Sequence, residues 1–241
     1  MATLLPRTLL ALCLLLCACK QEKTPLTNWE RAEKIKALRA EGSDLRKNGH
    51  NEQALIAFEK ALELADKTID FEEWTSCADS LAWVYAFPST TPEEKEKGAN
   101  LYREVLRQTE SHFGKDKPET AIAIARLVTF FRVSSISNPD AEQLMRRALL
   151  ITEATFGEKS PEVAGALGIL FWTLDDLHKL AEAESVMRRA LQIRIAINYK
   201  KEELEIKASI EYYRKLLLKM GDTEEQAQEK IDKMMEPLTK K

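Results

Sequence analysis

The sequence lacks the short motifs that assemble catalytic groups. It contains no phosphate-binding G-x-x-x-x-G-K-[ST] loop, no dinucleotide-binding G-x-G-x-x-G, no zinc-binding H-E-x-x-H and no G-x-S-x-G nucleophile turn. The net charge is only −3, and no basic run is interleaved with aromatic residues. The sequence therefore predicts a non-enzymatic chain that needs no cofactor and binds no nucleic acid.

Long hydrophobic runs are also missing. A run of ten uncharged apolar residues, 9–18, follows Arg7 and is too short to cross a bilayer, which takes about 20 residues. Such a run is typical of a signal peptide. It ends in the letters LCAC, which resemble the lipobox of bacterial lipoproteins, with leucine three residues and alanine one residue before Cys19. The resemblance implies that residues 1–18 are removed and that Cys19 is lipidated.

A lipid on Cys19 would anchor the mature chain to a membrane through a short tether, residues 19–28. Lys20 follows the cysteine in place of aspartate, which in Gram-negative lipoproteins implies the outer membrane, facing the periplasm. An ordinary secretory signal peptide is the alternative. With Cys19 acylated, Cys77 is the last free thiol, so no internal disulfide can form. Its apolar helical surroundings predict a small buried core residue.

The rest of the chain repeats one pattern, in which a small residue is followed by a large apolar residue four positions on and a second small residue three positions later. On a helix, these offsets place the three residues on one stripe. Each triple therefore predicts a helix packed closely against a neighbour, while the two arginines in the repeated letters MRRAL are expected to face solvent. The triples are Ala54-Phe58-Ala61, Gly98-Tyr102-Val105, Ala141-Met145-Ala148 and Ala183-Met187-Ala190.

A further apolar helix is expected ahead of each triple, with glycine and proline in the turns. Gly114 and Gly157 suit the left-handed end of a helix, and Pro118 and Pro161 suit the first position of the next. These helix pairs resemble tetratricopeptide repeats. Their period of 42 to 44 residues, with A-E-x-L-x-x-R-A-L followed by G-x-x-x-P, is more similar to the longer kinesin-light-chain subtype. The resemblance implies an all-α solenoid of antiparallel helix pairs, a TPR-like superhelix with about four repeats in residues 29–198.

The last segment, residues 199–241, predicts a degenerate fifth repeat or a capping helix pair. A long helical pattern ends at Gly221, and the spacing of the triples recurs near the C-terminus. Asp222 is expected to cap the last helix, with Glu225 at the capping-box spacing. A solenoid needs such an end because each unit buries its face only against its neighbours.

In proteins of this type, the first helix of each pair lines a concave face that binds extended peptides or a partner's helix, and the resemblance implies the same face here. Its basic positions in the first repeat suit an acidic segment or a C-terminal carboxylate, although a solvated helix face explains them as well. The inward positions are Lys36, Arg39, Ser43 and Arg46, then Ser76, Asp79 and Trp83, then Ile122, Ala125, Thr129 and Arg132, and finally Gly165, Gly168, Trp172 and Asp175.

Two kinds of residue stand out in this set. Trp83 and Trp172 are the strongest binding candidates because tryptophan is enriched in binding hot spots, although packing between helices explains each about as well. Gly165 and Gly168 each cost a helix about 1 kcal/mol relative to alanine. Their presence predicts close approach by another backbone, either a neighbouring helix or a bound ligand.

The most metal-like cluster is Asp175-Asp176-Leu177-His178, in which Asp175 and His178 would share a helix face. It offers two or three ligands at most, whereas a catalytic zinc takes three in fixed geometry, so a solvated turn is favoured. The sequence thus predicts an envelope-anchored adaptor that binds a protein or peptide. Alternatives are an assembly lipoprotein, such as a pilotin or an outer-membrane-protein assembly factor, and an enzyme or metal protein that uses Asp175 and His178.

Overall fold

The computed structural model describes residues 26–87, 90–197 and 203–239, and these parts contain ten helices and no strand. The predicted signal peptide (1–18), the lipidation site Cys19 and residues 19–25 of the predicted tether lie outside the described residues. In chain order the helices are α2 (Asn28–Lys47), α3 (Asn51–Leu64), α4 (Phe71–Val84), α5 (Pro92–Phe113), α6 (Pro118–Val133), α7 (Ala141–Phe156), α8 (Pro161–Asp176), α9 (Leu180–Ile197), α10 (Glu203–Lys219) and α11 (Glu224–Thr239).

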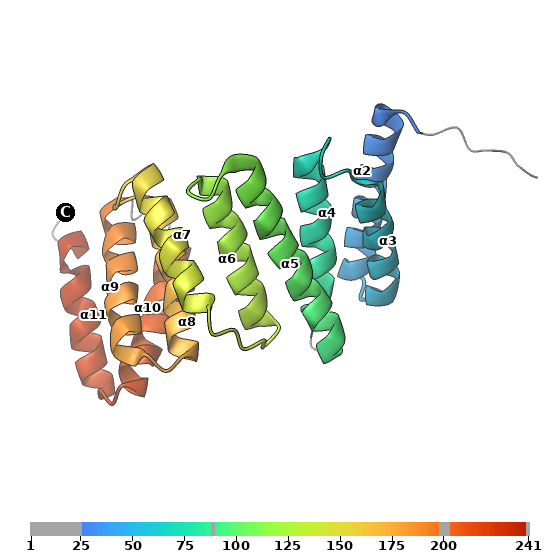
Figure 1. Ribbon diagram of the computed structural model, residues 1–241. Helices are drawn as coiled ribbons and strands as arrows, with labels where there is room; N and C mark the ends of the chain where they lie inside the picture. The colour runs from blue at the N-terminus through green and yellow to red at the C-terminus, as the bar shows by residue number, and fades with distance from the viewer. Residues whose placement is uncertain (1–25, 88–89, 198–202, 240–241) are drawn as a thin grey trace, which may run out of the picture.

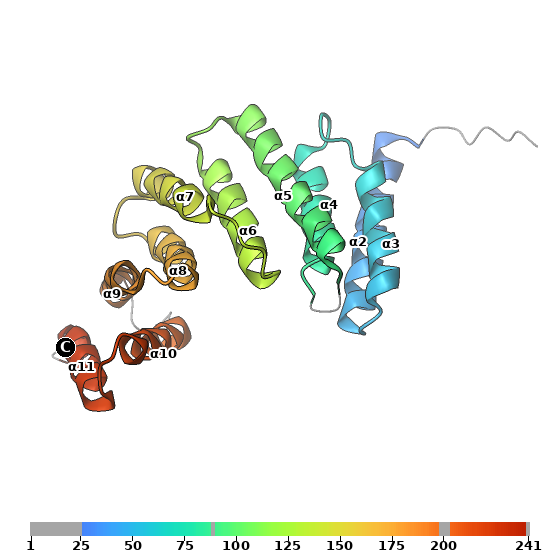
Figure 2. The same cartoon turned by 60° about the horizontal axis from the view of Figure 1, so that its bottom comes forward.

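The helices form antiparallel pairs that stack along a curved row (Figures 1 and 2). Each helix packs against the next one in the chain, and α6 also contacts α8, the first helix of the following pair. Helices α10 and α11 continue the stack beyond α9. The predicted all-α solenoid is confirmed.

The turns form at the glycines and prolines that the sequence marks. Gly114 and Gly157 end α5 and α7 with φ angles of 109° and 83°, a backbone conformation that glycine adopts without strain. Pro118 and Pro161 are the first residues of α6 and α8, where the missing amide proton leaves no hydrogen bond unmade. Successive helices therefore reverse direction at defined residues.

The start of α11 differs from the prediction. Thr223, rather than Asp222, is the capping residue: its hydroxyl accepts a hydrogen bond from the Gln226 N–H at 3.3 Å, and the Gln226 side-chain oxygen accepts one from the Thr223 N–H at 2.8 Å. The Asp222 carboxylate instead binds Lys230 Nζ at 2.6 Å. Threonine and glutamine form the same reciprocal capping box as the predicted Asp222 and Glu225, one residue later.

The small–large–small triples form the core between the helices. Their large residues Phe58, Tyr102, Met145 and Met187 are all buried. The small positions admit the neighbouring helix, because side chains on one helix fill the grooves of the next. In the first repeats, glycine faces an aromatic ring: Gly42 contacts Phe58, and Gly98 contacts Phe130. Cys77 is also fully buried, as expected, and burial raises the pKa of its thiol to about 11.

The expectation that the arginines after the buried methionines face solvent is confirmed for Arg146 and Arg188, which are exposed, and wrong for Arg147 and Arg189, which are half-buried. Arg147 Nη1 lies 2.6 Å from Glu110 Oε1 of α5, and its other terminal nitrogen donates to the Lys115 carbonyl at 2.5 Å. Arg189 Nη1 lies 2.6 Å from Glu153 Oε1 of α7. The partner in each pair lies in the preceding repeat, so these ion pairs join successive second helices.

Candidate functional site on the inner face of the arc

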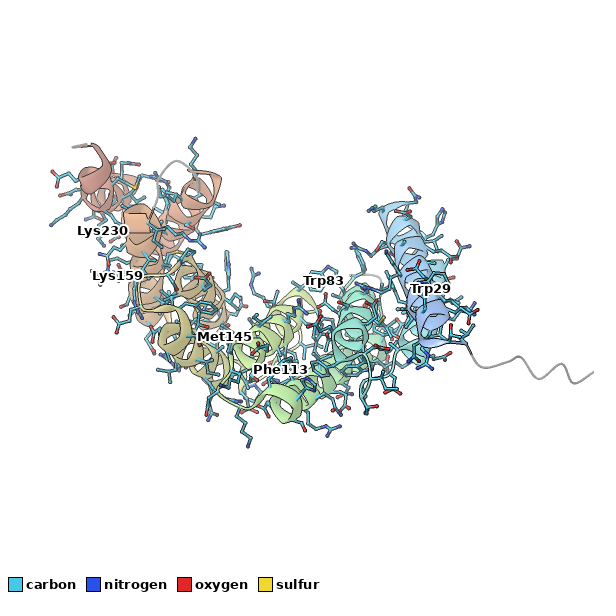
Figure 3. All side chains as sticks on the ribbon, turned by 90° about the horizontal axis from the view of Figure 1, so that it is seen from above. Trp29, Trp83, Phe113, Met145, Lys159 and Lys230 are labelled. Atoms are coloured by element: carbon cyan, nitrogen blue, oxygen red, sulfur yellow. The ribbon has the colours of Figure 1, made fainter. Side chains whose placement is uncertain are left out.

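The stack bends into an arc, and Figure 3 shows it from above with Trp83 on the inner side and Phe113 on the outer side. Trp83 belongs to α4, the first helix of its pair, whereas Phe113 ends α5, the second helix. First helices therefore supply the inner surface, as the resemblance to tetratricopeptide repeats implies.

Trp172 of α8 is the centre of a row of side chains that joins three successive first helices. The Arg132 guanidinium of α6 lies 4.2 Å from the centroid of the Trp172 ring. Tyr212 of α10 meets the same indole edge-on, at 4.4 Å between centroids and an interplanar angle of 78°. A cation over an indole and a perpendicular ring pair are both attractive arrangements. The predicted residues Arg132 and Trp172 are thus brought together.

Tyr212 is the member of this row that the sequence analysis missed. It is partly exposed and lies on α10, which the repeat pattern identifies only as a degenerate unit. The available signal was the adjacent pair of tyrosines in the letters EYYRK, because neighbouring helix positions lie about 100° apart and so can face different surroundings. Here Tyr213 is buried and its hydroxyl donates to Glu184, which leaves Tyr212 on the surface.

A small cavity of about 170 Å³ lies beside this row, between α8 and α10. Its walls combine aromatic and aliphatic side chains with two lysines and one carboxylate. Lys219 Nζ binds Asp175 Oδ1 at 2.6 Å, so the predicted inward residue Asp175 is held in an ion pair. The lining residues are Phe171, Trp172, Asp175, Tyr212, Lys215, Leu216 and Lys219.

A larger hollow of about 530 Å³ lies by the α6–α7 loop and the end of α8. Arg132 and Asp176 line it and approach one another at 3.6 Å, between Nε and Oδ2. The Arg132 guanidinium therefore contributes to this hollow and also contacts Trp172. One side chain connects the two concave features.

Gly165 and Gly168 continue the surface of α8 away from Trp172. A Cβ atom added at either position would have no neighbour within 4 Å. The expectation that a neighbouring helix approaches these glycines is therefore wrong. The alternative, a bound ligand, stays a prediction, because the space next to both glycines is open.

The inner positions of α4 are more fully engaged within the protein. The Asp79 carboxylate accepts a hydrogen bond from the Tyr102 hydroxyl at 2.7 Å and lies 3.9 Å from Arg126 Nη1. Burial, together with the Asp79 charge, holds the pKa of Tyr102 well above its usual range. Trp83 is half-buried and packs against the core cluster that contains Phe130.

The basic set on α2 is partly neutralised. Arg39 Nη1 donates to Glu73 Oε1 of α4 at 2.8 Å, so this charge joins the first two repeats.

The other predicted inward residues differ in exposure. On α2, Lys36 is exposed, and Ser43 and Arg46 are half-buried. On α4, Ser76 is half-buried, and on α6, Ala125 and Thr129 are half-buried while Ile122 is exposed.

The candidate metal cluster loses its geometric basis. Helix α8 ends at Asp176, and His178 follows in a turn with φ 57°, so Asp175 and His178 do not share a helix face. Asp175 binds Lys219 instead. Within the described ranges, no group of three or more histidine, cysteine or acidic side chains has the arrangement of a metal site.

No helix among the described residues combines the length and the apolar composition required to span a bilayer. This finding concerns the repeat domain and leaves residues 1–25 aside.

Comparisons with known proteins agree with the repeat geometry. A family model described as tetratricopeptide repeat matches residues 137–162, the segment of α7 and the turn into α8. Among curated proteins, none matches the chain significantly.

Solved structures resemble the chain over most of its length. BtubC (BKLC) from P. vanneervenii has a TM-score of 0.65 at 17% identity, covering 86% of this chain and 87% of that one. A kinesin-light-chain-type protein of P. anserina with nearly identical TPR-like repeats has a TM-score of 0.65 at 15% identity, covering 86% and 95%. A variant form of that protein gives a TM-score of 0.66 at 14% identity, covering 86% and 97%. The chain therefore contains a tetratricopeptide repeat and has the fold of kinesin-light-chain-like repeat proteins.

Proposed function

We propose that this chain is a lipid-anchored, non-enzymatic scaffold of the bacterial cell envelope that binds a protein segment across α6, α8 and α10. A tetratricopeptide fold suggests a protein-binding scaffold, since its stacked helices present one continuous curved surface. The observation that most directly supports this proposal is the position of Trp172. Its indole lies between Arg132 and Tyr212, beside the open surface at Gly165 and Gly168.

This arrangement suits a bound peptide or helix for two reasons. The Trp172 indole is already fixed by contacts on both sides, so little conformational freedom is lost when a partner packs against it. The glycines leave room for a backbone to come close to α8, and main-chain contacts tolerate varied partner side chains. Lys215 and Lys219 add donors at the rim of the adjoining cavity.

The envelope location rests on the N-terminal sequence. The apolar run 9–18 and the lipobox-like letters that end at Cys19 support processing and acylation there. Mass measurement of the protein extracted from membranes tests this directly: a chain that begins at Cys19 and carries acyl groups is expected. An unacylated N-terminus, or unchanged membrane association in a Cys19→Ser variant, would contradict the anchor.

Site-specific photo-crosslinking in living cells tests the groove. A photoreactive amino acid at Gly168, on the inner face of α8, is expected to crosslink one defined partner, which mass spectrometry identifies. The matched control is the same probe at Gln192, an exposed residue of α9, the second helix of the same repeat. Equal crosslinking to the same protein from both positions would show that binding is not confined to the inner face.

The Trp172→Ala variant measures how much the row of Arg132, Trp172 and Tyr212 contributes to the free energy of partner binding. Because buried tryptophans dominate many interfaces, we expect at least about 10-fold weaker binding to the partner identified at Gly168. Trp83→Ala is the comparison: both indoles pack against a core cluster, but Trp83 lies on α4, outside the proposed α6–α8–α10 surface, so a smaller loss is expected there. If the partner is an outer-membrane or secretion subunit whose assembly fails on deletion of the chain, the scaffold is an assembly lipoprotein.

A further inference from the structure

The N-terminal end of the first repeat exposes apolar side chains that nothing in the described part of the chain covers. Trp29, in the first turn of α2, is 73% exposed, the highest value among the exposed large hydrophobic residues. Leu26, just before the helix, is 37% exposed. Figure 3 shows Trp29 at the end of the arc.

Local structure explains why these residues do not pack against their own helix. Thr27 and Glu30 form a capping box: the Thr27 N–H donates to Glu30 Oε2 at 2.9 Å, and the Glu30 N–H donates to the Thr27 hydroxyl at 3.3 Å. In such a start, the residue before the cap commonly packs against an apolar residue in the helix's fourth position. That position is Arg31 here, so Leu26 lacks its usual apolar partner.

A third apolar residue lies at the same end of the repeat. Ile69, in the turn between α3 and α4, is 60% exposed, and its N–H donates to the Asp66 carbonyl at 3.2 Å. Asp66 and Arg31 line one hollow, which places the α3–α4 turn beside the start of α2. Leu26, Trp29 and Ile69, here called the N-terminal apolar end, therefore occupy one end of the first repeat.

The length of the chain before this end limits what can cover it. Leu26 lies seven positions after Cys19, and a fully extended chain spans at most about 3.6 Å per residue, or about 25 Å. If Cys19 carries the proposed lipid, the N-terminal apolar end is held within that distance of the bilayer surface. Tryptophan is enriched at membrane interfaces because its indole has both an apolar body and a polar N–H.

We propose that Leu26, Trp29 and Ile69 rest on the lipid surface as a second membrane contact. The inference extends the proposed lipid anchor, on which it rests. The contact would orient the solenoid with its first repeat on the bilayer. The N-terminal apolar end would lie against the headgroup region of a phospholipid bilayer.

The test uses the mature chain, residues 19–241, coupled through Cys19 to a maleimide lipid in phosphatidylcholine vesicles. Cys77 is fully buried, and burial raises the pKa of its thiol to about 11, so coupling is directed to Cys19. Lipids with acyl chains brominated near the headgroup quench tryptophan that enters the interface. We expect them to remove up to about a quarter of the emission, the share of one tryptophan among four.

The variants identify the source of this quenching. Trp29→Phe is expected to abolish it, and Leu26→Ser and Ile69→Ser are expected to reduce it while leaving Trp29 in place. Leu150→Ala is the matched control, because Leu150 is similarly apolar and exposed but belongs to α7. Circular dichroism of each variant confirms that the helices are retained.

Two results would overturn the proposal: no quenching of the coupled wild-type chain, or equal quenching in Trp29→Phe. Chemical coupling makes this test independent of acylation in the cell. If the cellular protein is unacylated but its coupled form is still quenched, the lipid anchor is contradicted and the membrane contact of the N-terminal apolar end is supported. If the cellular protein is acylated but its coupled form is not quenched, the lipid anchor is supported and the membrane contact is contradicted.

Discussion

The two halves of the concave face are built from the same helix positions but leave different chemistry available. In the N-terminal half, Arg39 is bound to Glu73, and Asp79 is bound to Tyr102. In the C-terminal half, Asp175 is also paired, with Lys219, but Trp172 contacts residues from both flanking helices and the glycines beside it face open space. A repeat pattern therefore fixes where a side chain projects, whereas the neighbouring repeats decide whether it is free to bind anything else.

Glycine substitutions should show the largest difference in stability between the two halves of the molecule, with Gly98 on α5, a second helix, and Gly168 on the inner face of α8. A Cβ at Gly98 would overlap the Phe130 ring and lie 3.0 Å from the Tyr85 Cβ, whereas a Cβ at Gly168 meets nothing within 4 Å. We expect Gly98→Ala to lower the free energy of unfolding by about 1–3 kcal/mol through overpacking. Gly168→Ala should raise it by up to about 1 kcal/mol, because alanine is the better helix former.

Urea unfolding followed by circular dichroism measures both glycine variants. A neutral Gly98→Ala would mean that the interface between the second and third repeats relaxes easily. A destabilising Gly168→Ala would mean that the surface at this glycine is less open than its surroundings indicate. Gly168→Ala also tests function, because a methyl group there is expected to weaken binding of a backbone that approaches α8.

This contrast also marks the limit of the sequence analysis. Gly98 was assigned to a packed triple from its spacing, and it is packed. Gly168 is followed by Trp172 four positions on, but Asp175 stands where the second small residue of a triple would be. The same residue type therefore allowed two interpretations, of which the neighbouring-helix one was wrong. Burial of Met145 and Met187 was predictable from periodicity because the repeat supplies its own partner.

Contacts between repeats were harder to predict. Arg147 looks solvated on its own helix, and its partner Glu110 lies 37 residues earlier. Tyr212 belongs to a helix whose repeat signal is weak, so its contact with Trp172 followed only from the three-dimensional stacking. Periodicity within one sequence identifies the buried stripe of each helix. Which side chains at the edge of that stripe contact the next helix depends on how the two helices cross.

Buried tyrosines provide a second comparison between the halves. The Tyr102 hydroxyl donates to Asp79, and the Tyr213 hydroxyl donates to Glu184, both at 2.7 Å. Burial and the neighbouring carboxylate raise the pKa of both phenols in the folded chain. Tyr102→Phe should therefore cost about 0.5–1.5 kcal/mol at neutral pH through the lost hydrogen bond.

The same tyrosines predict alkaline destabilisation. Because the folded-state pKa lies above the ordinary value of 10.0, the tyrosines' contribution is complete below pH 10 and is lost as pH rises toward the folded pKa. Burial also raises the pKa of Tyr85, to about 12. Thermal midpoints measured from pH 8 to 12 should fall above pH 10, and Tyr102→Phe should fall less steeply. An identical slope in wild type and variant would contradict this assignment.

The smallest effect concerns the ion pairs that second helices make with the preceding repeat, whose polarity differs between the halves. In the last three triples, the residue two positions after the large member forms the pair: Glu104 binds Lys67, in the turn after α3, at 3.2 Å, whereas Arg147 and Arg189 bind glutamates. The distance between the two positions suits an acid–base pair in either order. Because the order is reversed between the halves, a repeat stacked on the wrong neighbour would place two like charges together.

A charge exchange tests this interpretation. Arg189→Glu should cost about 0.2–1 kcal/mol by placing two carboxylates together, since both partners are partly exposed. Adding Glu153→Lys reproduces the polarity of the first pair and should restore most of the loss, as measured by a double-mutant cycle on urea unfolding. Arg188→Glu is the control, because Arg188 pairs within its own helix, with Glu184 at 3.6 Å. Strictly additive losses in the double variant would show that the pair contributes no coupling, and that the repeats are ordered by their cores alone.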